Sequence, residues 1–221
     1  MRGKFAAIIS AAFLICSIGA DAEAAITEEM VRTAWADVAR IAGMDPLPLS
    51  IEKNSTPNAW VTSGKSVTVT TGLMNLLERP EEIFGVLSHE AGHAKLKHHE
   101  SAVKSSVGIG VAALLLGKAL GGGIVGDVAV GVGSNLASAG FSREKEVEAD
   151  DFAVDIAFKG QKDPTGIYTA LERLSLAGGK LQPSGFNSHP PDDRRLLRVK
   201  NRILAKDPNV QFPKVEKKKN Q

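Results

Sequence analysis

Two histidines four residues apart, His89 and His93, enclose a glutamate in the middle of the chain. On a helix, four residues return the chain nearly to the same face, because one turn takes 3.6 residues. Both imidazole rings can therefore reach one metal ion. Zinc bound for catalysis usually takes three protein ligands and keeps a fourth position for water. The spacing thus predicts a metal site that needs a third ligand from another segment.

A second acidic segment offers that third ligand. Glu146 follows His93 by 53 residues and precedes Asp150 by four. We predict Glu146 as the third ligand. Asp150 would lie one turn further along the same helix, where its carboxylate can accept a hydrogen bond from the second ring nitrogen of a ligand histidine. Such a partner fixes the tautomer of the imidazole and raises its basicity.

Glu90 lies next to the first histidine and is suited to act as a general base. Zinc lowers the pKa of a bound water to about 7, but a base must still take the proton as that water attacks an amide. A motif this short also occurs by chance on exposed helices. The pair Glu146 and Asp150, together with Gly92, which leaves room near the metal, favours a site for one zinc ion per chain.

Two further histidines, His98 and His99, follow the motif. In the metzincin pattern the third ligand histidine is preceded by a glycine, and here Leu96 occupies the place of that glycine. A helix continuing from 81 to 104 would carry His99 roughly 15 Å beyond His89 along the helix axis. We therefore predict that His98 and His99 are solvated, or contact a ligand residue, without binding the metal.

Three blocks of the sequence together resemble one family. They are His89–His93, Phe141–Asp151 and Ser188–Pro191, the last followed by Arg194. The family is the HtpX-like zinc metalloendopeptidases of the gluzincin type, which include the CAAX prenyl proteases and the mitochondrial Oma-type enzymes. The chain is most similar to the small periplasmic members, and the resemblance covers residues 27–205. It implies an α+β, mainly helical zincin-like metalloprotease domain with a small sheet of about three strands.

The resemblance also assigns roles to single residues. It carries the ligand role to Glu146, because Glu144 and Glu148 do not stand four residues before Asp150. It places His189 close to the metal, where a donor can stabilise a developing oxyanion. Arg194 would help to order the site. The alternatives are that His189 caps the following helix and that Arg194 forms a surface ion pair.

The segment 47–71 alternates apolar and polar residues and is rich in β-branched side chains near its end, which predicts about three strands with a turn at Gly64. In the family, an Asn-Ala-aromatic sequence often lies on an edge strand that pairs with the extended substrate. Asn58, Ala59 and Trp60 match it, and such pairing binds a chain through its backbone. The alternative is that Asn58 ends a turn and Trp60 belongs to the core.

Helices are predicted from capping residues, prolines at helix starts and apolar stripes. We expect them at 27–43, 72–78, 81–104, 142–160, 163–178 and 192–205. In the last of these, Leu196, Leu197 and Val199 are expected to face inward.

Residues 1–22 have the features of a signal peptide: two basic residues, an apolar run over 5–19, and small residues before Glu23. The run is shorter than the ~20 residues of a membrane span, which favours cleavage, with an uncleaved anchor as the alternative. Cys16, the only cysteine, follows Ile15 rather than a small residue, so we predict neither a lipid anchor nor a disulfide. Cleavage would leave a net charge of +1, which gives no case for nucleic acid.

The domain prediction is a signal peptide at 1–22, a zinc metalloprotease domain at 23–207 and a basic, disordered tail at 208–221. Within the domain, residues 107–140 are rich in glycine and apolar residues. They could form a packed hairpin, a mobile flap, or a surface for membrane or outer-membrane assembly partners.

The predicted function is hydrolysis of extended or misfolded proteins, in the periplasm or after secretion, as part of envelope quality control. Membrane association is the alternative location. The alternative function is a non-catalytic, zinc-stabilised module that binds unfolded peptides.

Overall fold

The structure, a computed structural model, describes residues 25–62, 65–101, 141–177 and 193–216. The predicted signal peptide, the turn at Gly64, the segment 107–140 and His189 lie outside the described residues. Within the described ranges, no helix combines the length and the apolar character that crossing a membrane requires.

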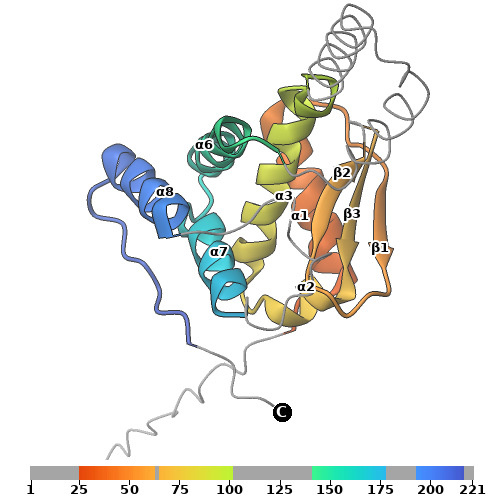
Figure 1. Ribbon diagram of the computed structural model, residues 1–221, viewed down its shortest axis with the longest axis horizontal. Coiled ribbons are helices and arrows are strands. Elements are labelled where there is room, and N and C mark those ends of the chain that lie inside the picture. Colours follow the sequence, from red (N-terminus) through yellow and green to blue (C-terminus); the bar gives the residue numbers. More distant parts are fainter. Residues whose placement is uncertain (1–24, 63–64, 102–140, 178–192, 217–221) are drawn as a thin grey trace, which may run out of the picture.

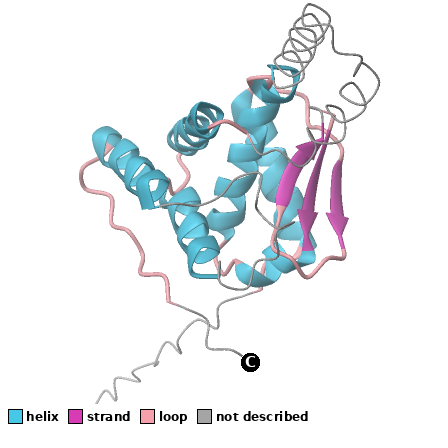
Figure 2. Cartoon of the chain, viewed as in Figure 1, coloured by secondary structure: helices cyan, strands magenta, loops and turns pink. Residues whose placement is uncertain are grey.

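One helix, α3 (Pro80–Lys95), runs through the centre of the molecule, with the sheet on one side and three helices on the other (Figures 1 and 2). The three are α6 (Arg143–Lys159), α7 (Thr165–Ala177) and α8 (Asp193–Lys206). Two further helices, α1 (Glu28–Ala42) and α2 (Thr71–Leu76), precede α3 in the chain, and α1 packs against it. The predicted α+β, mainly helical fold is confirmed.

The sheet has three strands, β1 (Leu49–Glu52), β2 (Ala59–Thr62) and β3 (Ser66–Thr70), in the order β1-β3-β2. The strand β3 pairs in parallel with β1 and antiparallel with β2. The strand β2 therefore forms one edge of this sheet, and it contacts α3. Ala59 and Val61 are buried in the core, whereas Trp60 between them points to the other face and is half-buried.

The first helix begins and ends as its sequence predicts. Thr27 Oγ1 accepts a hydrogen bond from the Met30 N–H at 3.2 Å, and Gly43 ends the helix with φ of 61°. A glycine is favoured there because other residues rarely adopt positive φ. Trp35 lies in the core and donates from Nε1 to the Leu47 carbonyl oxygen at 2.8 Å, which joins α1 to the segment leading into β1.

The beginning of α3 is fixed by buried charges. Pro80 is the first helical residue, and the Glu82 carboxylate accepts hydrogen bonds from the backbone N–H groups of Glu78 and Arg79 at 2.8 and 3.2 Å. Arg173 of α7 donates to Glu82 at 2.7 Å and also pairs with Glu78. Glu82 is fully buried and Arg173 nearly so. This network binds the start of α3 to α7.

Glycines allow α3 to lie close to two other helices. A Cβ atom on Gly85 would lie 2.4 Å from the backbone nitrogen of Ile167 in α7. A Cβ atom on Gly92 would lie 3.1 Å from the Cα atom of Ala149 in α6. The space beside Gly92 is thus filled by α6, and this close packing brings Glu146 toward the two histidines.

The end of α3 differs from the prediction of one helix over 81–104. The helix ends at Lys95, and the chain turns at Leu96 and Lys97 before helical residues resume at His98. Lys97 adopts a left-handed conformation with φ of 56°. The absence of a glycine therefore does not prevent a turn, and the expectation of a straight continuation is wrong.

The C-terminal helix presents an arginine to the interior. Arg195, Val199 and Ile203 are buried, whereas Leu197 is 59% exposed, so the prediction that Leu197 faces inward is wrong. Beyond α8, Val210 and Phe212 pack against α7 and α8, with the Phe212 ring 5.0 Å from the Tyr168 ring. The first residues of the predicted tail at 208–221 thus contact the domain, and residues 217–221 lie outside the described ranges.

Candidate metal centre

Three buried side chains from two helices converge on one point. His89 and His93 lie on α3 with their Nε2 atoms 3.0 Å apart. Glu146, in the first turn of α6, places Oε2 3.5 Å from His89 Nε2 and Oε1 3.4 Å from His93 Nε2. These are the three residues that the sequence predicts as ligands, and the structure brings them together as a group that could hold a metal ion.

The separations fit a zinc ion. Zinc lies ~2.0–2.2 Å from imidazole nitrogen and carboxylate oxygen, so tetrahedral ligand atoms around it are about 3.3 Å apart. The observed separations of 3.0 to 3.5 Å lie around that value. Two imidazoles and one carboxylate are also a common ligand set of catalytic zinc. The residues present therefore suit zinc in both chemistry and spacing.

The first histidine is held by a carboxylate on α6. His89 Nδ1 donates to Asp150 Oδ1 at 2.9 Å, which leaves Nε2 facing Glu146 and His93. Asp150 is thus placed beside His89, as predicted for a residue that orients a ligand. Burial lowers the pKa of His89, but its hydrogen bonds to Asp150 and Glu146 outweigh this and raise the pKa to about 9.

An arginine on α8 that is not among the residues predicted from the sequence completes this arrangement. Arg195 donates from Nε and Nη2 to the two carboxylate oxygens of Asp150 at 2.9 and 2.8 Å, and its Nη1 lies 3.0 Å from Glu146 Oε2. Burial raises the pKa of Asp150, but the charge of Arg195 and the hydrogen bond from His89 lower it to about 2. Asp150 is therefore ionised at neutral pH.

Arg194, the arginine that the resemblance selects, lies on the exposed face of α8. Its neighbour Arg195 contacts Asp150 and Glu146. Arg195, rather than Arg194, is therefore the arginine that can hold these two side chains in place. A signal in the sequence marks Arg195. It stands four residues before Val199 and eight before Ile203, which places it on the apolar stripe of the helix.

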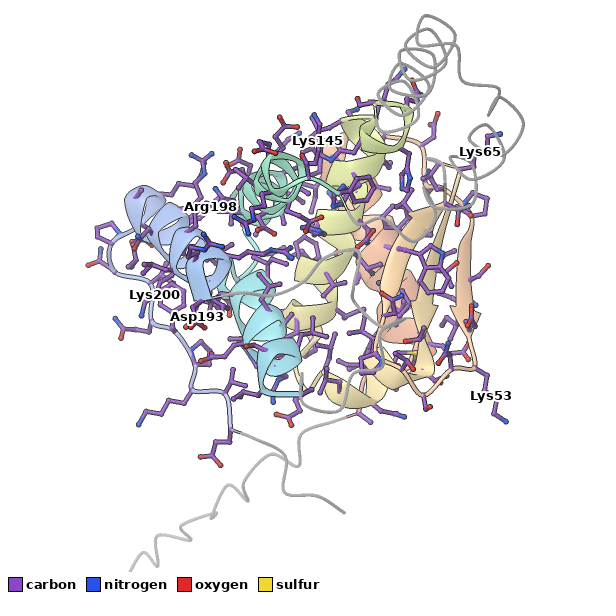
Figure 3. All side chains as sticks on the ribbon, viewed as in Figure 1. Lys53, Lys65, Lys145, Asp193, Arg198 and Lys200 are labelled. Carbon is purple, nitrogen blue, oxygen red and sulfur yellow. The ribbon has the colours of Figure 1, made fainter. Side chains whose placement is uncertain are left out.

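Two more arginines fix the position of α8 on α6. Arg198, labelled in Figure 3, donates to Asp151 at 2.9 Å and to the Val147 carbonyl oxygen at 3.0 Å. Arg202 donates to Asp155 at 3.0 Å. Each of these partly exposed ion pairs adds little stability, about 0–1 kcal/mol. Their regular spacing nevertheless fixes the register of the two helices, which keeps Arg195 beside Asp150.

The second histidine has a different neighbour. His98, which is fully buried, places Nδ1 2.8 Å from His93 Nδ1, and its Nε2 lies 2.9 Å from Glu148 Oε2. The Phe141 ring stacks on the His93 ring with centroids 4.1 Å apart, and it also contacts His99. Of the predicted alternatives for His98, contact with a ligand is the one observed. Burial lowers the pKa of His98 despite its hydrogen bond to Glu148, so this ring is neutral at neutral pH.

Glu90, the predicted general base, is fully buried on α3 between the two histidines in sequence. Its negative charge, with those of Asp150 and Glu146, raises the pKa of Arg195 against the opposing effect of burial. Glu90 thus belongs electrostatically to the same cluster. Its catalytic role and that of His189, which lies outside the described residues, stay predictions.

The predicted substrate strand coincides with β2, except that Asn58 lies just before it. The Asn58 N–H donates to Thr70 Oγ1 at 2.9 Å, and the Asn58 carbonyl oxygen accepts from the Thr70 N–H at 3.0 Å. Asn58 therefore joins β2 to the end of β3. The alternative that Trp60 is a core residue is not what the structure shows, because Trp60 is half-buried on the face away from Ala59.

Comparisons with known proteins agree with this geometry. Metalloprotease YcaL of Escherichia coli (strain K12) is 36% identical in an alignment of 172 residues, and the alignment covers 72% of this chain and 63% of that protein. Metalloprotease LoiP of the same organism is 30% identical in an alignment of 152 residues, which covers 67% of this chain and 59% of that protein. A protease HtpX homolog of Persephonella marina is 26% identical in an alignment of 211 residues, which covers 74% of this chain and 71% of that protein. The chain thus spans about three fifths of the length of YcaL and LoiP.

A sequence model of one family, peptidase family M48, matches residues 25–203. This range contains the sheet, the histidines of α3, Glu146 of α6 and Arg195 of α8. Since the match covers most of the chain and includes every element that forms the candidate metal centre, the chain belongs to peptidase family M48, a family of zinc metalloproteases.

Proposed function

We propose that this chain is a zinc-dependent endopeptidase that hydrolyses peptide bonds in extended or misfolded proteins. The observation that carries the proposal is the convergence of His89, His93 and Glu146 at spacings that suit zinc, with Glu90 buried on the same helix. A zinc site used only for structure normally has four protein ligands, whereas three ligands leave a position for water. Among the described residues, three side chains form the group.

Zinc, when bound by the three side chains, supplies a Lewis acid that makes water a nucleophile near neutral pH and polarises the scissile carbonyl. Glu90 accepts the proton of the attacking water and then gives it to the leaving amine. Asp150 and Arg195 hold the His89 ring and the Glu146 carboxylate in their orientations. His189 is proposed to donate a hydrogen bond to the developing oxyanion.

The substrate is proposed to lie along β2. In the described part of the chain, β2 pairs with β3 alone, and it contacts the helix that carries the metal ligands. Pairing with a strand edge binds a peptide through backbone hydrogen bonds, so it requires an extended conformation rather than a particular sequence. Asn58, Ala59 and Trp60 would position that peptide. This arrangement favours unfolded protein as the substrate class.

The place of action is proposed to be the cell envelope, in protein quality control. The support is the pattern of residues 1–22, which is typical of a cleaved export signal. Cell fractionation and N-terminal sequencing test this, and we expect a periplasmic protein that begins at Glu23. Recovery with the membranes would instead favour an uncleaved anchor or a membrane contact through residues 107–140.

The central test compares the full chain with Glu90→Gln. The substitution removes the base but leaves the three ligands, so both proteins should bind about one zinc per chain. Cleavage of casein should fall by about 10²–10⁴-fold, the usual contribution of a general base. Glu100→Gln is the matched control, because Glu100 is an exposed glutamate on the segment that follows the same helix. It should cleave casein like the unmodified chain.

The other outcomes separate the alternatives. If both proteins bind zinc and neither cleaves casein, the second candidate, a zinc-stabilised peptide-binding module that uses the edge of β2, is favoured. If the unmodified chain binds no zinc, the three-ligand assignment is wrong.

A further inference from the structure

His98 is a buried histidine that the predicted ligand set does not include. It lies five residues after His93, and in a continuous helix that spacing would turn its side chain about 140° away from His93. The turn at Leu96 and Lys97 removes this difference. The Leu96 N–H still bonds to the Gly92 carbonyl oxygen at 2.9 Å, and Lys97 then interrupts the helix with its positive φ of 56°. His98 is thereby brought against His93.

The ligand role of His93 fixes the direction of the hydrogen bond between the two rings. His93 points Nε2 toward His89 and Glu146, so its proton must be on Nδ1 when Nε2 binds a metal ion. That N–H can donate only to an acceptor, and His98 Nδ1 lies 2.8 Å away. His98 must then carry its own proton on Nε2.

The far side of His98 is consistent with this tautomer. His98 Nε2 lies 2.9 Å from a carboxylate oxygen of Glu148, which is an acceptor for an N–H group. Glu148 is half exposed and also pairs with Lys145, labelled in Figure 3, at 3.0 Å. One set of protons therefore satisfies every contact: His93 donates to His98, and His98 donates to Glu148.

We propose that His98, oriented by Glu148, is a positioning residue that keeps His93 in the tautomer that binds metal through Nε2. The contacts run from the ligand Glu146 through His93 and His98 to Glu148. Glu146 and Glu148 both lie on α6, two residues apart. The two ligand histidines are thus held differently. His89 is held by a carboxylate directly, and His93 by a neutral ring between it and a carboxylate. The inference rests on the proposed metal site and adds a residue to it.

The test is the zinc affinity of His98 variants of the full chain, measured by competition with a chromophoric chelator. His98→Leu removes the acceptor and should weaken zinc binding about 10–100-fold, the usual cost of losing such a partner. His98→Asn keeps an oxygen near the position of Nδ1 and should recover most of the loss. The visible spectrum of the cobalt-loaded protein should change in His98→Leu and resemble that of the unmodified chain in His98→Asn.

Glu148→Ala tests the far end of the contact at a partly exposed position, where folding is not at risk. It should weaken zinc binding by less than His98→Leu does. Glu144→Ala, an exposed glutamate one turn earlier on α6, is the control with the same change of charge and should have no effect. Ring ¹⁵N chemical shifts of the metal-free protein should show a proton on His93 Nδ1, and His98→Leu should lose this preference.

The outcomes distinguish this inference from the proposed function. A folded, unmodified chain that binds no zinc refutes the metal site itself. Zinc binding by the unmodified chain, with equal affinity and an unchanged cobalt spectrum in His98→Leu, refutes the role of His98 alone. Equal losses in Glu148→Ala and Glu144→Ala would also overturn it, because they would show an effect of charge rather than of the contact.

Discussion

The two ends of α3 both bury ionisable side chains, but they do so in opposite ways. At the first end, the Glu82 carboxylate meets backbone N–H groups and the Arg173 guanidinium, so every acceptor faces a donor. At the other end, two imidazole nitrogens and the Glu146 carboxylate face one another at 3.0 to 3.5 Å. The two nitrogens and the carboxylate can all act as lone-pair donors. Only a cation between them, or protons, makes that arrangement favourable.

The difference shows what distinguishes a structural cluster of buried charge from a functional one. Burial alone does not, since Glu82 and His93 are equally inaccessible to water. The two kinds of cluster differ in whether the lone pairs of the buried groups point at N–H donors or at one another. At the first end, N–H donors of the protein pair with the buried Glu82 carboxylate. At the second end, two imidazole nitrogens and the Glu146 carboxylate converge on one point, where a metal ion can bind. Breaking the first cluster should therefore cost stability, whereas breaking the second should cost metal affinity.

The largest effect is expected from Arg173→Met, which leaves the Glu82 charge buried without its guanidinium. We expect a loss of about 3–5 kcal/mol in the free energy of unfolding, measured in urea with excess chelator. Zinc content per folded chain should not change. Adding Glu82→Gln should restore much of the loss, because glutamine still accepts from the N–H groups of Glu78 and Arg79. If Arg173→Met lost zinc at unchanged stability, the pair of Glu82 and Arg173 would serve the metal site rather than the stability of the fold.

Glu146→Gln should have the opposite effect. Zinc binding by a small protein site is worth roughly 10–16 kcal/mol over its ligands, so loss of one ligand should weaken binding on the order of 100-fold or more. The free energy of unfolding in excess chelator should change by about 1 kcal/mol or less, because Arg195 keeps its two hydrogen bonds to Asp150. A large loss of stability without zinc would show that Glu146 is mainly structural.

Two glycines on α3 allow the same substitution at both ends. In Gly85→Ala the new methyl group would meet the Ile167 backbone at 2.4 Å, which forces α7 to move and should cost about 1–3 kcal/mol of stability. In Gly92→Ala the nearest atom is 3.1 Å away, so a small shift of Ala149 suffices. The gain of up to ~1 kcal/mol in helix propensity should offset that strain.

The measurement for this pair is urea unfolding together with zinc affinity. The shift of Ala149 moves α6 and with it Glu146, so Gly92→Ala should weaken zinc binding, by less than Glu146→Gln does. Gly85→Ala should bind zinc normally while it is folded. If the two variants had equal stability and equal zinc affinity, the first end of α3 would not be the structural end and the second would not be the metal-binding end.

The sequence predicts the features that depend on short spacings. The pairing of His89 with His93 follows from the helical repeat, and Glu146 and Asp150 follow from a second helix with the same repeat. The ends of α1 and the start of α3 follow from Thr27, Gly43 and Pro80. At these helix ends a single residue type has one strong local preference, so no tertiary contact is needed to explain them.

Features that depend on tertiary contacts were missed. Lys97 takes a left-handed conformation that local preference assigns to glycine, and contacts of His98 with His93 and Glu148 accompany this turn. Arg195 is a charged residue, and such residues are expected on the exposed face of a helix, although its position on the apolar stripe marks it as buried. Phe212 is an isolated aromatic residue after a proline, and no periodicity points to its contact with Tyr168.

The smallest effect is expected at the rim of the first cluster, where Arg79 of the α3 cap pairs with Asp163 before α7. Arg79 Nη2 donates to Asp163 Oδ2 at 2.7 Å, and Asp163 Oδ1 accepts from the Thr165 N–H at 2.8 Å. Burial raises the pKa of Asp163, but the hydrogen bonds from Thr165 and Arg79 outweigh it and lower the pKa below its ordinary value of 3.8. The folded state therefore favours the charged carboxylate.

A depressed pKa stabilises the protein above the pKa of the unfolded chain, and this stability is lost as the pH falls below 3.8 through the lower pKa of the folded state. Asp163→Asn keeps the acceptor for Thr165 but removes the charge, so it should cost at most about 1 kcal/mol at pH 7 and less at high salt, since the pair is partly exposed. Urea unfolding at pH 7 should show this difference, and the difference should shrink progressively toward zero in acid. If the free-energy cost of Asp163→Asn stayed constant from pH 7 into acid, it would have to come from packing rather than charge. In that case the rim would not belong to the network of paired charges that distinguishes the first end of α3 from the metal centre.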